Sequence, residues 1–300
     1  MMLKNSLKKA PYNSRLGLEV LPGSNLLNLT DLQRHQLKQS LWSHGVIVVK
    51  NQQMTAFELE EFARKTFGDL MFGGNSFSLA PDLSPDIQSQ YTAILGNPKG
   101  LDQEPPEKIF GARVWHQDKD GVPRIEELDM NALYVVMLYS IKVPEQGENG
   151  QPHTTEYLDL IEAYNNLAPS HQKELKQISM YQMSPIYARK NLNWDDVPKK
   201  VHPIVSTHKV TGQKGLYLGS WNTAIPLGME DKPEQAQQYW QDLFETVLKH
   251  TPVYSHVWEP GDIIFWDNSQ VMHRGTFYDS TQYQRIALRL GVVDCHSGNP

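Results

Sequence analysis

The chain has 300 residues and a mass of 34.3 kDa, which suits one enzyme-sized domain or two smaller ones. Its formal net charge is −6, with 28 Lys and Arg against 34 Asp and Glu, which argues against a protein that binds nucleic acid or a membrane surface through an excess of basic residues. The single cysteine, Cys295, excludes an internal disulfide framework and a thiolate-rich metal site. The basic N-terminal residues precede no apolar segment, and no apolar run is long enough to cross a bilayer, so we expect a cytoplasmic protein without membrane insertion.

Two helices and a strand are predicted near the N-terminus. Both helices begin with a capping box, in which a threonine is followed three residues later by Gln or Glu. These boxes predict helices over Thr30–His44 and Thr55–Thr66. The β-branched run Val46–Val49 between them predicts a buried strand.

The middle of the chain is less regular. Met71–Arg113 is rich in Gly, Pro, Asn and Ser, and such a long irregular stretch in a compact chain is usually functional, so we expect an active-site loop or lid. Ala132–Val143 predicts a long strand. Thr154–Leu167 and Ser170–Ile178 are interpreted as helices, which makes residues 154–200 a helical insertion.

The C-terminal part is rich in strands. The pattern predicts one amphipathic helix, Gln235–Lys249, and strands at Val201–Val205, Gly215–Leu218, Val253–Trp258, Ile263–Trp266 and Arg285–Val293. Strands at this density, separated by Pro and Gly turns, favour a sandwich or barrel. The fold class is therefore mainly β with flanking helices.

His116 and Asp118 are candidate metal ligands. Residues i and i+2 of an extended segment point to the same side, so this imidazole and this carboxylate are presented together. A surface pair in a loop is the alternative for this motif alone. His273 follows a strand far along the chain and would complete two histidines and one carboxylate. That ligand set leaves open positions and suits non-haem Fe(II).

Arg285 and Arg289 lie four residues apart in an apolar strand pattern and therefore share one face. Two guanidinium groups directed into a core are costly unless they meet anions, and a guanidinium fork matches a carboxylate. The alternative, from spacing alone, is that both arginines face solvent.

An ordered set of segments along most of the chain resembles one known family. The segments are Leu41–Val48, Phe62–Leu70, Trp115–Asp118, His202–His208, Trp258–Asp262, Trp266–Asn268, His273 and Arg285–Arg289. In this set the chain resembles the taurine dioxygenase/TfdA family of Fe(II)- and 2-oxoglutarate-dependent oxygenases. The resemblance implies one oxygenase domain over residues 1–300, folded as a double-stranded β-helix, the jelly-roll barrel of clavaminate synthase-like proteins.

The resemblance also implies roles for single residues. His116, Asp118 and His273 would be the catalytic iron ligands, and Arg285 would bind the distal carboxylate of the cosubstrate 2-oxoglutarate, assisted by Thr155. Family members usually have Gly-Asp before this threonine, where this chain has His153-Thr154. The implied reaction uses O2 to hydroxylate or otherwise oxidise an unactivated C–H bond, with release of succinate and CO2.

The substrate is expected to be a small and anionic molecule. After Phe67–Leu70 the taurine enzymes carry a His-x-His-Pro-x-Tyr run that helps to hold the sulfonate, and here Gly73 and Ser76 replace its binding histidine and tyrosine. Taurine itself is therefore disfavoured. Arg289 matches a family position that often holds an anionic group of the substrate; the alternative for this arginine is an internal salt bridge. Asn97 and Ser76 are further candidates for substrate binding.

Two alternatives remain open at this point. One is a cupin-like non-redox metalloenzyme with the same ligands, which would not need Arg285 or Thr155. The other is a non-catalytic jelly-roll binding module, in which the three metal-ligand candidates would not converge. Fold alone does not separate these functions. The family resemblance further suggests a homo-oligomer.

Overall fold

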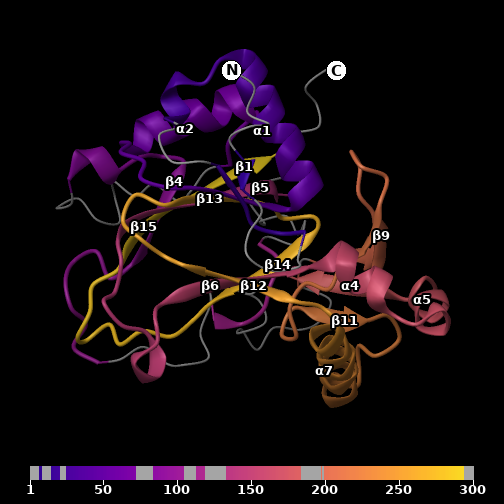
Figure 1. Cartoon of the computed structure of the whole chain (residues 1–300). Helices are drawn as coiled ribbons and strands as arrows, with labels where there is room; N and C mark the ends of the chain where they lie inside the picture. The colour runs from indigo at the N-terminus through magenta and orange to yellow at the C-terminus, as the bar shows by residue number, and fades with distance from the viewer. Residues whose placement is uncertain are drawn as a thin grey trace.

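The computed structural model describes residues 7–8, 15–20, 25–71, 84–104, 113–118, 133–183, 197 and 199–293. Two β-sheets face each other, and helices cover the outside (Figure 1). This is the mainly β architecture with flanking helices that the sequence predicts. Of the helices in these ranges, none combines the length and the apolarity that a membrane crossing requires.

The larger sheet has seven strands in the order β1-β2-β3-β13-β5-β15-β4. Its members are β1 (Leu7–Lys8), β2 (Leu18–Val20), β3 (Val46–Val49), β4 (Thr92–Gly96), β5 (Leu133–Lys142), β13 (Ile263–Asp267) and β15 (Ile286–Val293). All of these strands pair antiparallel except β2 and β3, which run parallel. From β3 onward, the order alternates strands from early and late parts of the chain.

The smaller sheet that faces it has the order β12-β6-β14. Its strands are β6 (Thr154–Asp159), β12 (Val253–Val257) and β14 (Val271–Gly275). Side chains from both sheets fill the interior between them, among them Val136, Leu138, Tyr157, Tyr254 and Trp266. One of the metal-ligand candidates, His273, belongs to β14 and therefore lies on the smaller sheet.

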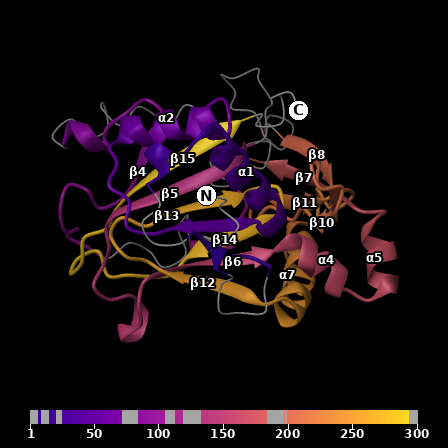
Figure 2. The same cartoon turned by 45° about the horizontal axis from the view of Figure 1, so that its top comes forward.

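Two helices cover the outer face of the larger sheet, as Figure 2 shows. They are α1 (Asp31–His44) and α2 (Ala56–Thr66), and both begin with the predicted capping boxes at Thr30 and Thr55. Their apolar residues pack with those of β3, β5, β13 and β15 in one core. Gly45 ends α1 with a positive φ of 66°, and a Cβ there would lie 2.7 Å from Leu16, which explains a glycine at this turn.

The remaining elements extend one end of the sandwich (Figure 1). They are α4 (Leu160–Asn166), α5 (Pro169–Leu175), α7 (Pro233–His250), β7 (Ser179–Met183), β8 (Lys199–Pro203), β9 (Val205–Thr207), β10 (Lys214–Leu216) and β11 (Ala224–Pro226). Three short single turns, Leu26–Asn28, Pro85–Ile87 and Glu148–Gly150, complete the described elements. The predicted amphipathic helix is α7, and its Trp240, Leu243, Phe244 and Val247 are buried.

Two predictions of local structure are wrong. Residues Thr154–Asp159 are not the start of a helix: they pair with β12 on one side and β14 on the other, and the helix begins only at Leu160. Asp159 accepts hydrogen bonds from the backbone N–H groups of Ile161 and Glu162 and so caps it. A strand, β7, also lies in the supposed helical insertion. The stretch Met71–Arg113 contains strand β4, which pairs with β15.

Candidate metal centre

A single backbone bridge brings the two candidate histidines together. The N–H of His116 donates to the carbonyl of His273 at 3.1 Å, and the N–H of His273 donates back at 3.0 Å. Their imidazole rings lie with centroids 4.3 Å apart. Strand β14 thus fixes one histidine, and the short segment 113–118 carries the other to it.

Asp118 completes the group. Its Oδ1 lies 3.7 Å from Nε2 of His116, and its Oδ2 lies 3.7 Å from Nε2 of His273. One ligand atom from each of these three residues lies within 4.8 Å of the others. The structure therefore brings together the His-x-Asp pair and the distant histidine that the sequence singled out.

The protonation of these groups suits a divalent metal ion. Nδ1 of His116 donates to the carbonyl of Val114 at 2.6 Å, so Nε2 is the ring nitrogen that lies beside Asp118 and can serve as a metal ligand. Burial and the neighbouring His116 lower the pKa of His273 to about 3, so its ring is neutral. Burial alone would raise the pKa of Asp118, but Arg289, His273 and His116 together hold it well below its usual range. Two imidazoles and one carboxylate fit a first-row divalent metal with open positions.

Arg289 extends from β15 to the same carboxylate. Its Nη2 lies 3.1 Å from Oδ1 of Asp118, and its Nε donates to Oδ2 at 3.3 Å. The side chains are 20% and 14% exposed. The arginine thus faces the candidate metal centre rather than bulk solvent, and it neutralises the carboxylate there.

A clamp that the sequence analysis did not identify holds the backbone of Asp118. Asn268, in the turn between β13 and β14, accepts from the N–H of Asp118 at 2.8 Å and donates to its carbonyl at 2.6 Å. Gln117 donates to the carbonyl of Asn268 at 2.9 Å and accepts from the N–H groups of Leu218 and Gly219. Both side chains are buried. Both residues lie in segments that carry the family resemblance, beside the ligand motif and the strand end, but the sequence does not indicate that they contact each other.

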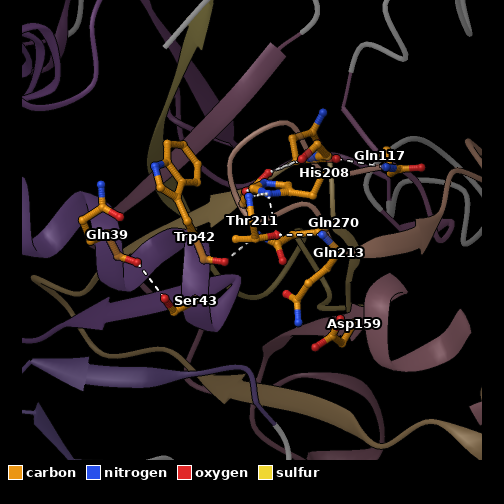
Figure 3. Close-up of polar contacts among 12 residues, drawn as sticks. Gln39, Trp42, Ser43, Gln117, Asp159, His208, Thr211, Gln213 and Gln270 are labelled. Carbon is orange, nitrogen blue, oxygen red and sulfur yellow. Dashed lines mark hydrogen bonds and ion pairs between the residues drawn. The ribbon is translucent and has the colours of Figure 1, made fainter. Parts of the chain in front are cut away.

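A chain of polar side chains holds that turn in place, and Figure 3 shows its members His208, Thr211, Gln270 and Asp159. His208 donates from Nε2 to Asp267 at 2.7 Å, because its Nδ1 accepts from the N–H of Thr211. Gln270 donates to the same carboxylate at 2.6 Å and accepts from Arg15 at 2.7 Å. Arg15 in turn binds Asp159 through two hydrogen bonds. Every member is paired, so the network fixes the turn that carries Asn268.

Arg285 lies at the end of β15, in a cavity at one end of the interior between the sheets. The cavity is lined by Ser140, Lys142, Val143, Pro144, His153, Trp258, Arg285 and Ala287. Burial lowers the pKa of Arg285, yet the group stays charged, and among the described residues no carboxylate pairs with it. Thr155 is nearby on β6, where its hydroxyl accepts from Nε1 of Trp258 at 2.8 Å.

Asn97 and Ser76 are the two remaining residues that the sequence analysis named as candidates for substrate binding. The side chain of Asn97 donates to the carbonyls of Ser280 and Tyr283 and accepts from the N–H of Arg285 at 2.7 Å. Asn97 thus holds the backbone at the start of β15, and its amide is directed into this loop. Ser76 lies outside the described residues.

Comparisons with known proteins are consistent over nearly the whole chain. Residues 7–290 match the family model described as "Taurine catabolism dioxygenase TauD, TfdA family". An (S)-phenoxypropionate/alpha-ketoglutarate-dioxygenase of Sphingobium herbicidovorans is 28% identical and covers 91% of this chain and 90% of its own. An alpha-ketoglutarate-dependent 2,4-dichlorophenoxyacetate dioxygenase of Burkholderia sp. is 27% identical over 86% of this chain and 85% of its own.

Solved structures confirm the fold. AAD-2 in complex with Mn(II) and N-oxalylglycine superposes with a TM-score of 0.75 at 21% identity, over 98% of both chains. A taurine dioxygenase from Burkholderia xenovorans gives a TM-score of 0.70 at 19% identity, over 96% of this chain and 89% of its own. The predicted jelly-roll core is therefore confirmed.

Proposed function

From the premise that this chain belongs to the TauD/TfdA family of dioxygenases, we propose which of its residues carry out the reaction. The chain is a Fe(II)- and 2-oxoglutarate-dependent non-haem iron dioxygenase that oxidises a small molecule with O2 and releases succinate and CO2. What we propose is how individual residues of this chain take part in that reaction.

His116, Asp118 and His273 are the iron ligands. The observation that carries this assignment is the convergence of two Nε2 atoms and one carboxylate from distant segments, with His116 held in the required tautomer by Val114. Iron held there supplies the activation of O2 and the oxidation of the substrate C–H bond, coupled to the decarboxylation of 2-oxoglutarate. The protein's part is to keep the His273 imidazole neutral and the Asp118 carboxylate ionised.

Arg285 binds the distal carboxylate of 2-oxoglutarate, and Thr155 assists. The support is a buried guanidinium without a carboxylate partner among the described residues, since such a charge is costly until an anion meets it. Trp258 and Ala287, which belong to the apolar cluster between the sheets, also line the cavity around Arg285. Apolar side chains between the sheets exclude water around the cosubstrate.

The substrate is a small organic acid. Arg289 places a guanidinium directly beside the ligand group, and it can hold an anionic substrate there in addition to Asp118. Two relatives are named for aryloxy-carboxylates, phenoxypropionate and 2,4-dichlorophenoxyacetate. Release of succinate with a panel of such acids, and its loss in Arg289→Ala, would support this class. Turnover of only neutral compounds would contradict it.

The iron and cosubstrate sites are tested together by visible spectroscopy. Fe(II) and 2-oxoglutarate are added to the metal-free protein without oxygen, with His273→Ala as control. We expect a weak charge-transfer band that the variant lacks. Bound iron without a band would contradict the roles of Arg285 and Thr155, and absence of iron binding would contradict the ligand assignment.

Three further expectations remain proposals of the same kind. They are that residues 1–300 form one domain, that the protein is cytoplasmic, and that it forms a homo-oligomer. Size-exclusion chromatography with light scattering tests the last of these: a mass equal to the 34.3 kDa chain would contradict it.

A further inference from the structure

We propose that His153 is a second binding residue for the distal carboxylate of 2-oxoglutarate, acting beside Arg285 and setting the affinity for the cosubstrate. This inference rests on the proposed function, because it assumes that Arg285 receives that carboxylate. It adds a residue whose side chain neither the metal centre nor the fold otherwise uses.

The first observation is the position of the ring. His153 lines the same cavity as Arg285, Ser140 and Trp258, and it is only 3% exposed. It immediately precedes β6, so the strand that carries Thr155 also fixes His153. Its ring packs edge-on against Tyr278, with centroids 5.3 Å apart, which restrains its orientation.

The second observation is an unused polar atom. Nε2 of His153 is buried and has no hydrogen-bond partner among the described residues. Leaving such a group unsatisfied is costly, so the atom calls for a partner that the protein itself does not provide. Nδ1 lies 3.4 Å from the hydroxyl of Thr276, and that hydroxyl donates to the carbonyl of Thr154 at 3.2 Å. The proposal requires the tautomer in which this hydroxyl turns to donate to Nδ1, so that Nε2 carries the ring hydrogen and is the donor.

The positive charges around the His153 ring favour an anionic ligand in this cavity. Arg285 and Arg113 both act electrostatically on His153, and Lys142 lines the same cavity. A ligand group that enters between these cations and a ring N–H donor must accept hydrogen bonds and carry negative charge. A carboxylate does both: it can take the guanidinium fork of Arg285 and still offer a lone pair to Nε2.

The test measures cosubstrate binding rather than turnover. Mn(II)-loaded protein is titrated with 2-oxoglutarate under nitrogen by calorimetry, for the wild type, His153→Ala, His153→Gln and Arg285→Ala. A hydrogen bond to a charged group predicts that His153→Ala weakens 2-oxoglutarate about tenfold or more. Glutamine keeps an N–H donor, so His153→Gln should recover part of that loss. His35→Ala, an exposed histidine on α1, is the matched control and should bind like the wild type.

Pyruvate is the second probe, since it has the 2-oxo acid group without the distal carboxylate. If the His153 variants affect only the distal end, their affinity for pyruvate stays at the wild-type value, whereas a general folding defect would weaken both ligands. If His153→Ala leaves the affinity for 2-oxoglutarate unchanged and Arg285→Ala greatly reduces it, the role of His153 is overturned, whereas the role of Arg285 stands. Unchanged affinity in both variants would overturn the cosubstrate pocket itself.

Discussion

Two buried histidines, His153 and His273, make the stability of the folded protein depend on pH. Burial, together with Arg285 and Arg113, lowers the pKa of His153 to about 3, and the pKa of His273 is also about 3. In the unfolded chain both titrate near the ordinary value of about 6.5. Between these limits the unfolded state binds more protons than the folded state, so stability is full above about pH 6.5 and falls as the pH is lowered toward 3.

The metal-free protein should therefore lose stability as the pH is lowered through this window. Each buried histidine should contribute a slope of up to about 1.4 kcal/mol per pH unit to the free energy of unfolding in that window. His153→Gln, which does not titrate, should therefore show a flatter dependence than the wild type. Urea unfolding at several pH values between 4 and 7 measures it, with His35→Ala as the exposed control. Parallel curves for wild type and His153→Gln would contradict the buried, neutral state of this ring.

The site was predictable from the sequence only where its signals are local or characteristic of the family. The i, i+2 spacing of His116 and Asp118 places both groups on one side, and the structure confirms their proximity to each other and to His273. The clamp by Asn268 could not be predicted, because it depends on a turn that lies 150 residues further along the chain. The unused Nε2 of His153 is visible only once its surroundings are known.

At the scale of elements, the turn between β13 and β14 positions the ligand segment. Asn268 uses both ends of its amide on the backbone of Asp118, so Asn268→Ala should leave that carboxylate poorly held. Outer residues that orient ligands typically affect metal affinity by about tenfold or more, and we expect a loss of this size for Mn(II), measured by calorimetry. Asn166→Ala removes a comparable side-chain-to-backbone bond, to the carbonyl of His250, and should bind Mn(II) normally. Equal affinity in both variants would show that the clamp does not position the ligand.

Elements with local start signals were predicted well, and those defined by distant pairing were not. The capping boxes at Thr30 and Thr55 act within four residues, so both helices begin where the sequence indicates. Strand β6 was mistaken for a helix because its partners, β12 and β14, lie about 100 residues further along the chain. Strand β4 was missed for the same reason, since only its pairing with β15 defines it. Tertiary pairing here overrides local pattern.

At the scale of the whole molecule, ligand binding should stabilise the fold. The ligand group joins segment 113–118 to β14, and the cosubstrate cavity joins β5, β15 and the residues before β6. A ligand that binds only the folded state at about 100 times its Kd adds about 2.7 kcal/mol. We therefore expect Mn(II) with 2-oxoglutarate to raise Tm by several degrees in differential scanning calorimetry. His116→Ala should lose this shift, and an equal shift in that variant would place the metal elsewhere.

The order of strands has a consequence for the protein during its synthesis. In the larger sheet β13 lies between β3 and β5, and β15 lies between β5 and β4, while both neighbours of β6 belong to the last 50 residues. A ribosome that has made the first 250 residues therefore presents four strands whose main partners do not yet exist. Unpaired strand edges promote association between chains. We therefore expect the nascent polypeptide to be most prone to association before its last strand emerges from the exit tunnel.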